Sequence, residues 1–378
     1  MSESATERDL TEGSLLRPLL ALSAPIVLTQ LLQVLYNLVD TFWVGRLGQD
    51  AVSALSFSWP PVFVLISLGG GLTLAGSVLV AQNKGADKLE RVNEVAGQTL
   101  AFVTLFSLVL GVIGYFMAPT FLRLIGAEPG TTVFTYSVEY MRVIFVGVWF
   151  MFGFFVFQSL LRGWGDTKTP MYLMLGSVGL NVVLDPIFIL GFADNPLFGW
   201  LGLEGLSATL LAATGFDGAG VTGAAVATVG SRALATTAGM WLLFSDRVGI
   251  SLTLADLRLE WTTVKKLVDV GAPLSVEQST QAMATTVMTA LVAIVGADAV
   301  AAYGIGGRFG TILWLPMVGM GMAVETVVGQ NLGAGRADRA KRTVYLASGI
   351  LVGAFLVVAA AVVTFAEPIV GLFVTGEE

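Results

Sequence analysis

The chain has 378 residues, of which 55% are hydrophobic and 12% are charged, and its mean hydropathy is +0.81. A soluble domain carries about 25% charged residues, so the composition predicts an all-α polytopic protein embedded in a lipid bilayer. The sequence has no Cys and no His and a net charge of −7, which excludes disulfides, imidazole catalysis and Cys/His metal sites and argues against nucleic acid as a partner. We therefore expect no enzyme activity and no cofactor.

Nine apolar segments are long enough to cross a membrane, which takes about 20 residues. In chain order they are residues 16–45, 51–82, 95–118, 132–161, 169–192, 218–245, 264–294, 299–331 and 343–366. The polar tail before the first segment lacks the pattern of a signal peptide. The absence of a Walker A motif excludes ATP as the energy source.

Basic residues concentrate in the loops after every second segment, for example Lys84, Arg162, Arg258 and Arg336. By the positive-inside rule these loops and the N-terminus are cytoplasmic, so we predict a multi-pass protein of the cell membrane. The loop from 191 to 218 contains acidic residues and no base, which places it outside. Its apolar part, 197–211, suits the membrane interface.

The sequence repeats itself at an offset of 248 residues, the separation of Asp40 and Met288. Pro25 falls on Pro273, and the stretch V-A-Q-N-K-G-A at 80–86 falls on V-G-Q-N-L-G-A at 328–334. Both copies start on the same side, because six segments separate them. This predicts a parallel repeat about an axis along the membrane normal.

The repeat divides the chain into four predicted regions. They are a cytoplasmic tail (1–15), an N-lobe of six transmembrane helices (16–245), an amphipathic cytoplasmic linker (246–262) and an incomplete C-lobe of three helices (263–378). The second copy lacks the counterpart of the last three helices of the first, so we expect a fragment or a naturally truncated product.

Asp40 is the key position that the second copy does not share, because its counterpart is Met288. A charge near the bilayer centre costs about 2.5–3.5 kcal/mol on insertion scales, so this carboxylate requires a function or a partner. It shares a polar stripe of the first helix with Gln33, Tyr36 and Asn37, which precede it by seven, four and three residues. The alternative is an interfacial Asp40 paired with Arg46.

A second buried acid, Asp185, stands in N-V-V-L-D-P-I-F at 181–188. Asn181 lies four residues earlier, on the same helix face, and Pro186 frees a backbone carbonyl one turn before it. These oxygens form half of a site for a hard cation, and burial also favours a protonated carboxyl. The alternative is that Asp185 caps a helix break. Thr228 adds a hydroxyl on a helix rich in small residues, where simple close packing is the other interpretation.

Other buried groups have a less specific interpretation. For Glu139, Glu277 and Glu325 we favour a structural or interfacial role. The aromatic run 149–157 (W-F-M-F-G-F-F-V-F) either faces lipid or, together with Met171, Met174, Met283 and Met288, lines an adaptable apolar cavity.

Several of these stretches resemble the MATE family, the multidrug and toxic compound extrusion transporters, and its DinF-type branch in particular. The matching text is A-P-I-V-L-T-Q and Y-N-L-V-D-T-F-W-V-G-R-L-G in the first segment, L-R-G-W-G-D-T-K-T-P at 161–170, N-V-V-L-D-P-I-F, and V-G-Q-N-L-G-A-G at 328–335. The resemblance implies two six-helix lobes around a central cleft, with about nine of the twelve helices present here. It also implies export of organic, often cationic, compounds in exchange for H⁺ or Na⁺.

The resemblance assigns roles to individual residues. Asp40 matches the essential aspartate of the first helix, and Pro25 matches its bending point. Asn181, Asp185 and Thr228 match the other members of a cation site in the N-lobe, which would bind Na⁺ in a sodium-coupled protein. Gln33, Tyr36, Asn37, Tyr140 and Gln158 match the hydrogen-bonding neighbours of that site.

We therefore predict a monomeric antiporter that exports small organic substrates by alternating access, coupled to H⁺ or Na⁺. Ion entry would neutralise Asp40 and Asp185, and the first helix would bend at Pro25. One alternative is a lipid-linked oligosaccharide flippase, which we disfavour because the predicted membrane interior contains only three bases, Arg142, Arg232 and Arg308. The other alternative is a truncated fragment that does not transport.

Overall fold

The computed structural model describes residues 10–193, 195–295 and 297–364. These residues form eleven α-helices and no β-strand. The helices are α1 (Leu16–Gly45), α2 (Gln49–Gly85), α3 (Leu89–Leu124), α4 (Thr132–Trp164), α5 (Lys168–Leu190), α6 (Pro196–Trp200), α7 (Glu204–Thr214), α8 (Gly220–Leu243), α9 (Trp261–Val295), α10 (Ala297–Gly333) and α11 (Ala337–Thr364). The prediction of an all-α fold is confirmed.

Each of the nine predicted segments coincides with one of the nine long helices. Within the described residues, six of these helices, α1 to α5 and α11, are both long and apolar enough to cross a membrane. The other three, α8, α9 and α10, contain 24, 35 and 37 residues. At about 1.5 Å of rise per residue each of them also exceeds the thickness of a bilayer core.

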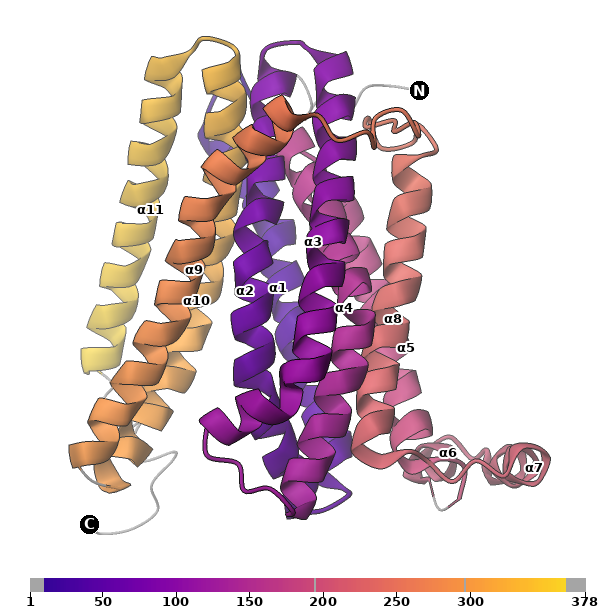
Figure 1. Cartoon of the computed structure of the whole chain (residues 1–378). Coiled ribbons are helices and arrows are strands. Elements are labelled where there is room, and N and C mark those ends of the chain that lie inside the picture. The colour runs from indigo at the N-terminus through magenta and orange to yellow at the C-terminus, as the bar shows by residue number, and fades with distance from the viewer. Residues whose placement is uncertain (1–9, 194, 296, 365–378) are drawn as a thin grey trace.

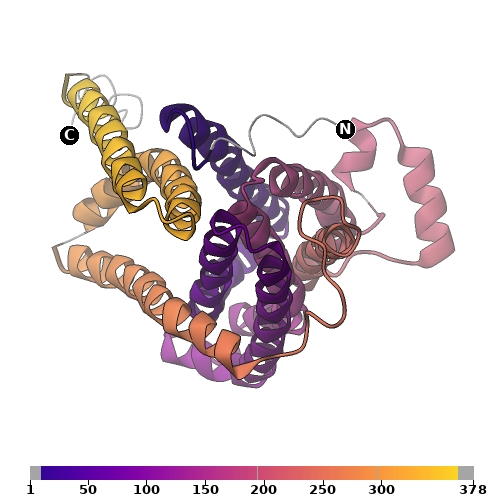
Figure 2. The same ribbon diagram turned by 90° about the horizontal axis from the view of Figure 1, so that it is seen from above.

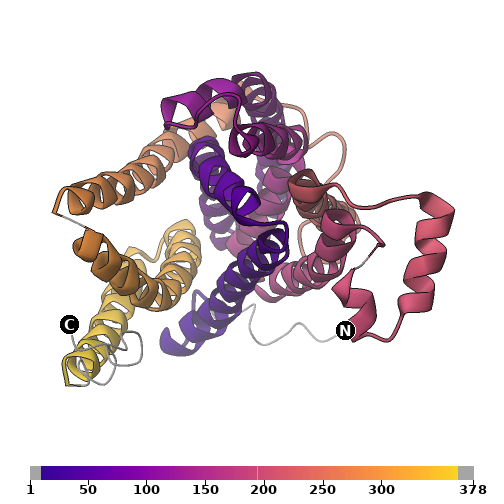
Figure 3. The same ribbon diagram turned by 90° about the horizontal axis from the view of Figure 1, so that it is seen from below.

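Two groups of helices stand side by side (Figures 1 and 2). Helices α1 to α5 and α8 form one bundle, in which α4 packs against α2, α3 and α8. On the side of α1 and α2, α9 lies along α2, α10 contacts both α1 and α2, and α11 packs on α10. The short helices α6 and α7 project sideways from the bundle, as Figure 3 shows from below. The division of the chain into lobes and a linker with these sidedness assignments stays a prediction.

Several boundaries differ from the predicted ones. Helix α4 continues to Trp164 before Gly165, with φ +101°, ends it, and α2 continues to Gly85. The predictions that Arg162 and Lys84 belong to loops are therefore wrong. The stretch 197–211, predicted to be external, covers most of α6, most of α7 and the turn between them. The linker forms turns, and its Ile250 and Leu252 are buried against the bundle.

The two copies of the repeat meet at the end of the molecule where α2 and α10 finish. Asn83 donates from Nδ2 to the carbonyl of Leu79 at 2.8 Å, and its counterpart Asn331 donates in the same way to Val327 at 2.7 Å. A Cβ atom on Gly85 would overlap the carbonyl oxygen of Gln330, and one on Gly333 would overlap that of Gln82. These positions are again 248 apart (333 − 85 and 330 − 82), so the contact is reciprocal, as in a two-fold interface.

The segment before α1 is held at this same end. Asn331 donates from Nδ2 to the carbonyl of Leu10 at 2.8 Å, Arg336 pairs with Glu12 at 2.9 Å, and Arg339 donates to the carbonyl of Gly13 at 2.8 Å. The start of α1 is therefore tied to the turn between α10 and α11.

The reciprocal contact predicts a cost for any side chain at Gly85. Alanine is the better helix former by about 1 kcal/mol, but overpacking costs about 1–3 kcal/mol, so we expect Gly85→Ala to lower the melting temperature of the purified protein. The control is Gly176→Ala, because a Cβ at that helical position meets no atom within 4 Å. Melting followed by tryptophan fluorescence checks this, and equal stability of the two variants would contradict it.

Candidate functional site

A cluster of buried polar side chains lies inside the first bundle. Asp40 on α1 is 3% exposed, Asn181 and Asp185 on α5 are fully buried, and Thr228 on α8 is 2% exposed. These three helices come together because α5 packs against both α1 and α8. Tyr140 of α4, 1% exposed, interacts electrostatically with both carboxylates.

Hydrogen bonds fix part of this cluster. Asn181 donates from Nδ2 to Oδ1 of Asp185 at 2.7 Å, as expected for residues four apart on one helix face. Tyr36, one turn before Asp40, places its hydroxyl 2.9 Å from Oγ of Ser231 and 3.3 Å from the carbonyl of Thr228. The aspartate-bearing turn of α1 is thereby anchored to α8.

Five oxygen atoms of the cluster are buried and have no hydrogen-bond partner. They are Asp40 Oδ1, Asp185 Oδ2, Asn181 Oδ1, Thr228 Oγ1 and the Tyr140 hydroxyl. Buried polar atoms are normally hydrogen-bonded, and two neighbouring carboxylates repel each other when both are ionised. A proton or a cation bound among these oxygens would remove both costs.

The element and charge of these five ligand atoms limit which cation can bind among them. Every unpartnered atom is an oxygen, the ligand type that hard cations prefer. Among the described residues no group of three or more acidic side chains forms. With two carboxylates and three neutral oxygens, the set suits a proton or a monovalent metal ion such as Na⁺.

Arg232 is a neighbour of this cluster that the sequence reasoning counted only as a base in the membrane. It is 3% exposed, donates from Nη2 to Oε1 of Gln33 at 2.6 Å, and its guanidinium stands 4.7 Å from the ring centre of Tyr36. Arg232 follows Thr228 by four residues, so both lie on one face of α8. This spacing could have predicted that Arg232 lies next to the cluster.

The structure separates some residues that the sequence grouped together. Asn37 is exposed, although Gln33 donates to its Oδ1 at 3.2 Å, so only part of the polar stripe reaches the cluster. Pro25 is buried in α1, and Thr29 donates to its carbonyl at 2.8 Å. Gln158 lines a separate cavity.

Two structural alternatives are wrong. Arg46 stacks over Phe42, Trp43 and Trp200, and in the described part of the chain Asp40 has no ion pair. Asp185 lies inside α5, which continues to Leu190, so it does not cap a helix break.

The other candidate acids lie elsewhere. Glu139 accepts a hydrogen bond from the Thr222 hydroxyl at 3.1 Å and is exposed. Glu325 is close to Arg162, and the two interact electrostatically. Glu277 interacts electrostatically with Glu325.

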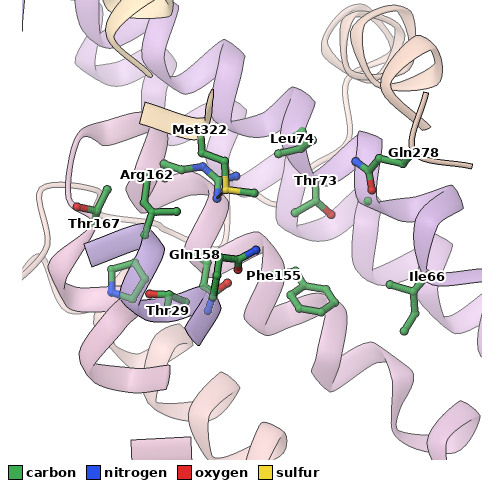
Figure 4. A pocket seen from close by; sticks show the side chains of 14 residues that line it. Thr29, Ile66, Thr73, Leu74, Phe155, Gln158, Arg162, Thr167, Gln278 and Met322 are labelled. Carbon is green, nitrogen blue, oxygen red and sulfur yellow. Dashed lines mark hydrogen bonds between the residues drawn. The ribbon is translucent and has the colours of Figure 1, made fainter. Parts of the chain in front are cut away.

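A cavity of about 390 Å³ lies between the two groups of helices (Figure 4). Side chains of α1, α2 and α4 line it on one side, and Gln278 of α9 and Met322 of α10 line it on the other. Figure 4 shows Arg162 beside Met322, and Gln158 and Phe155 along the same helix. Its polar lining is Thr29, Gln30, Thr73, Gln158, Arg162, Thr167 and Gln278.

The aromatic run of α4 mostly fills the bundle. Phe152, Phe154 and Phe157 are fully buried, so the lipid-facing interpretation is wrong for them, and Phe155 is the member that lines the cavity. Met174 is buried next to Arg232, whereas Met288 is exposed. Met171 is partly buried, and the side chain of Met283 lies outside the described residues.

The helical architecture, the buried acids and the cavity between two helix groups are the features of a membrane transporter. A family model described as MatE matches residues 25–187 and 273–378. The probable multidrug resistance protein YoeA of Bacillus subtilis is 31% identical over 361 residues, which cover 94% of this chain and 72% of that protein. The chain belongs to the MatE family.

Solved structures agree with this membership. The crystal structure of a MATE in the bent conformation has a TM-score of 0.81 at 27% identity and covers 98% of this chain and 77% of its own. An outward-facing multidrug resistance MATE family transporter has a TM-score of 0.79 at 28% identity and covers 99% of this chain and 77% of its own. The assignment to the DinF-type branch stays a prediction.

The hydroxyl of Tyr36 predicts a measurable stability effect. Tyr36→Phe removes its hydrogen bonds to Ser231 and Thr228 of α8, which contribute about 0.5–1.5 kcal/mol each, while Ser231 keeps its own bond to the carbonyl of Thr228. We expect a lower melting temperature for this variant and no change for Tyr172→Phe, because Tyr172 is 62% exposed on α5. An unchanged melting temperature of Tyr36→Phe would show that these bonds do not stabilise the bundle.

Proposed function

We propose that this protein is an antiporter of the cell membrane that exports small organic compounds in exchange for H⁺ or Na⁺. The observation that carries the proposal is the set of five unpartnered oxygens around Asp40 and Asp185. A buried site of this kind binds a cation when the carboxylates are accessible and becomes less negative once the cation is bound. Energy stored in an ion gradient can then be converted into a conformational change.

Helix α1 connects the proposed ion site mechanically with the cavity. Tyr36 and Asp40 belong to the cluster, whereas Ile26, Thr29 and Gln30 line the cavity. The ten residues from Gln30 to Asp40 span about 15 Å of helix. Pro25 cannot donate a backbone hydrogen bond, so α1 can bend at this point, and such a bend would reshape the cavity when the charge on Asp40 changes.

The cavity supports small organic molecules as substrates. Its volume of about 390 Å³ falls in the range of sites for drug-sized ligands, about 300–1,000 Å³. A lipid-linked oligosaccharide is far larger, so the cavity does not favour the flippase alternative. The name of the YoeA relative, a probable multidrug resistance protein, is consistent with export of such compounds. The cationic preference that the resemblance implies is not favoured by Arg162 in the cavity wall.

Asp40→Asn is expected to abolish ion-driven export, because the amide can neither take up a proton nor offer a charge to a cation. The purified protein is reconstituted into liposomes, and export of two dyes, ethidium and dansylglycine, is followed after an inward H⁺ or Na⁺ gradient is applied. The control is Asp50→Asn, which removes the same charge at an exposed position of α2. If the Asp40 variant exported either dye at the unsubstituted rate under both gradients, the proposed coupling would be wrong.

Pro25→Ala is expected to reduce export by roughly several-fold, as changes at hinge positions often do, because a straight α1 restores the missing backbone hydrogen bond. Cation binding should persist, since the cluster lies well away from the bend, and would appear as an unchanged effect of Na⁺ or pH on the melting temperature. Pro60→Ala, at an exposed position of α2, is the control. Export equal to that of the control would exclude bending at Pro25 as a step of transport.

A further inference from the structure

The charge of the cavity differs from the charge of the ion site. Among the lining residues that the structure describes, Arg162 is the one charged side chain. Asp40, Asp185 and Glu325 are not part of the lining. A compound in the cavity therefore meets one positive charge, three glutamine amides (Gln30, Gln158 and Gln278), hydroxyls and apolar surface.

The guanidinium of Arg162 has hydrogen-bond donors without a strong acceptor. It carries five N–H groups, and the structure pairs Nη1 with the thioether sulfur of Met322 at 3.3 Å, a weak acceptor. Its Nε is buried without a hydrogen-bond partner. An unsatisfied buried donor is costly, and a negative charge placed beside the guanidinium from the cavity would lower the cost of burying this positive charge.

The neighbouring acid does not neutralise this arginine by direct contact. Arg162 and Glu325 interact electrostatically, but they form no ion pair in the structure, although both are described. Oε2 of Glu325 is itself buried without a hydrogen-bond partner. The position of Arg162 is fixed across the two helix groups, because the Thr326 hydroxyl of α10 donates to its backbone carbonyl at 3.0 Å.

We propose that the cavity binds an amphipathic organic monoanion, whose carboxylate is held by Arg162 and whose aromatic or apolar body lies against Phe155, Ile66 and Leu74. This inference rests on the proposed function, because it names the substrate class of the same transporter. A planar guanidinium binds a carboxylate through two parallel hydrogen bonds, among the strongest in proteins. One arginine balances one negative charge, whereas an organic cation would be repelled and would find no acid in the described lining.

The test compares three ligands that share a dansyl ring system and differ in charge. They are dansylglycine (a carboxylate), dansylglycinamide (neutral) and dansylcholine (a cation). Binding to the purified full chain is measured without any ion gradient, from the change in dansyl fluorescence on entering an apolar site. We expect dansylglycine to bind at least about tenfold more tightly than the amide, the scale of a hydrogen bond to a charged group, and dansylcholine to bind most weakly.

Variants then show which positive charge causes the preference for dansylglycine over its amide. Arg162→Gln should bind dansylglycine and its amide about equally, and Arg162→Lys should keep part of the preference. Arg247→Gln, which removes an exposed charge near Trp241, should behave as the unsubstituted protein. Melting curves establish that each variant is folded.

The inference is overturned if dansylcholine or the amide binds the unsubstituted protein as tightly as dansylglycine, a result that needs no variant. It is also overturned if folded Arg162→Gln keeps the full preference. Ligand preference is measured without an ion gradient and ion-driven export is measured with one, so a failure of this inference and a failure of ion coupling are read from different measurements.

Discussion

The constraint on which this molecule depends is the burial of Asp40 and Asp185 inside an apolar bundle. Each carboxylate has a buried oxygen without a hydrogen-bond partner, and neither forms an ion pair in the described part of the chain. Two such groups are costly to hold ionised in a low dielectric. A bound cation or proton would lower this cost, and the antiport proposed for this protein depends on that difference between the occupied and the empty site.

The buried polar cluster and the cavity are separate places, and helix α1 contributes residues to both. Helix α1 contributes Asp40 to the cluster and Gln30 to the cavity, with Pro25 beyond both. At the end where α1 begins, the reciprocal contact of Gly85 and Gly333 brings the two repeats together without intervening side chains. A bend in α1 would thus change the cavity while this contact holds one end of the two helix groups together.

The sequence predicted more of the fold than of the site. Long apolar segments predict membrane helices because a bilayer satisfies no backbone hydrogen bonds. All nine predicted segments are helical, and in the described part of the chain six of these helices are long and apolar enough to cross a membrane. Arg162 was misplaced because its position depends on the last turn of α4, and helix ends are set by local capping at Gly165 rather than by hydropathy. Asn37 was grouped with the cluster because helical spacing defines a face, but the packing of neighbouring helices decides how much of that face is buried.

The amino-acid sequence was enough to identify the buried acids, the repeat and the family. A charged residue in an apolar segment and a constant offset of 248 residues can both be recognised from the order of the residues alone. The convergence of Asp40, Asp185, Thr228 and Tyr140 from four helices required the folded chain. The folded chain was also required to show that Arg162 is the one charged side chain in the described lining of the cavity. Contacts between helices far apart in the sequence leave no periodic signal in the sequence of either helix.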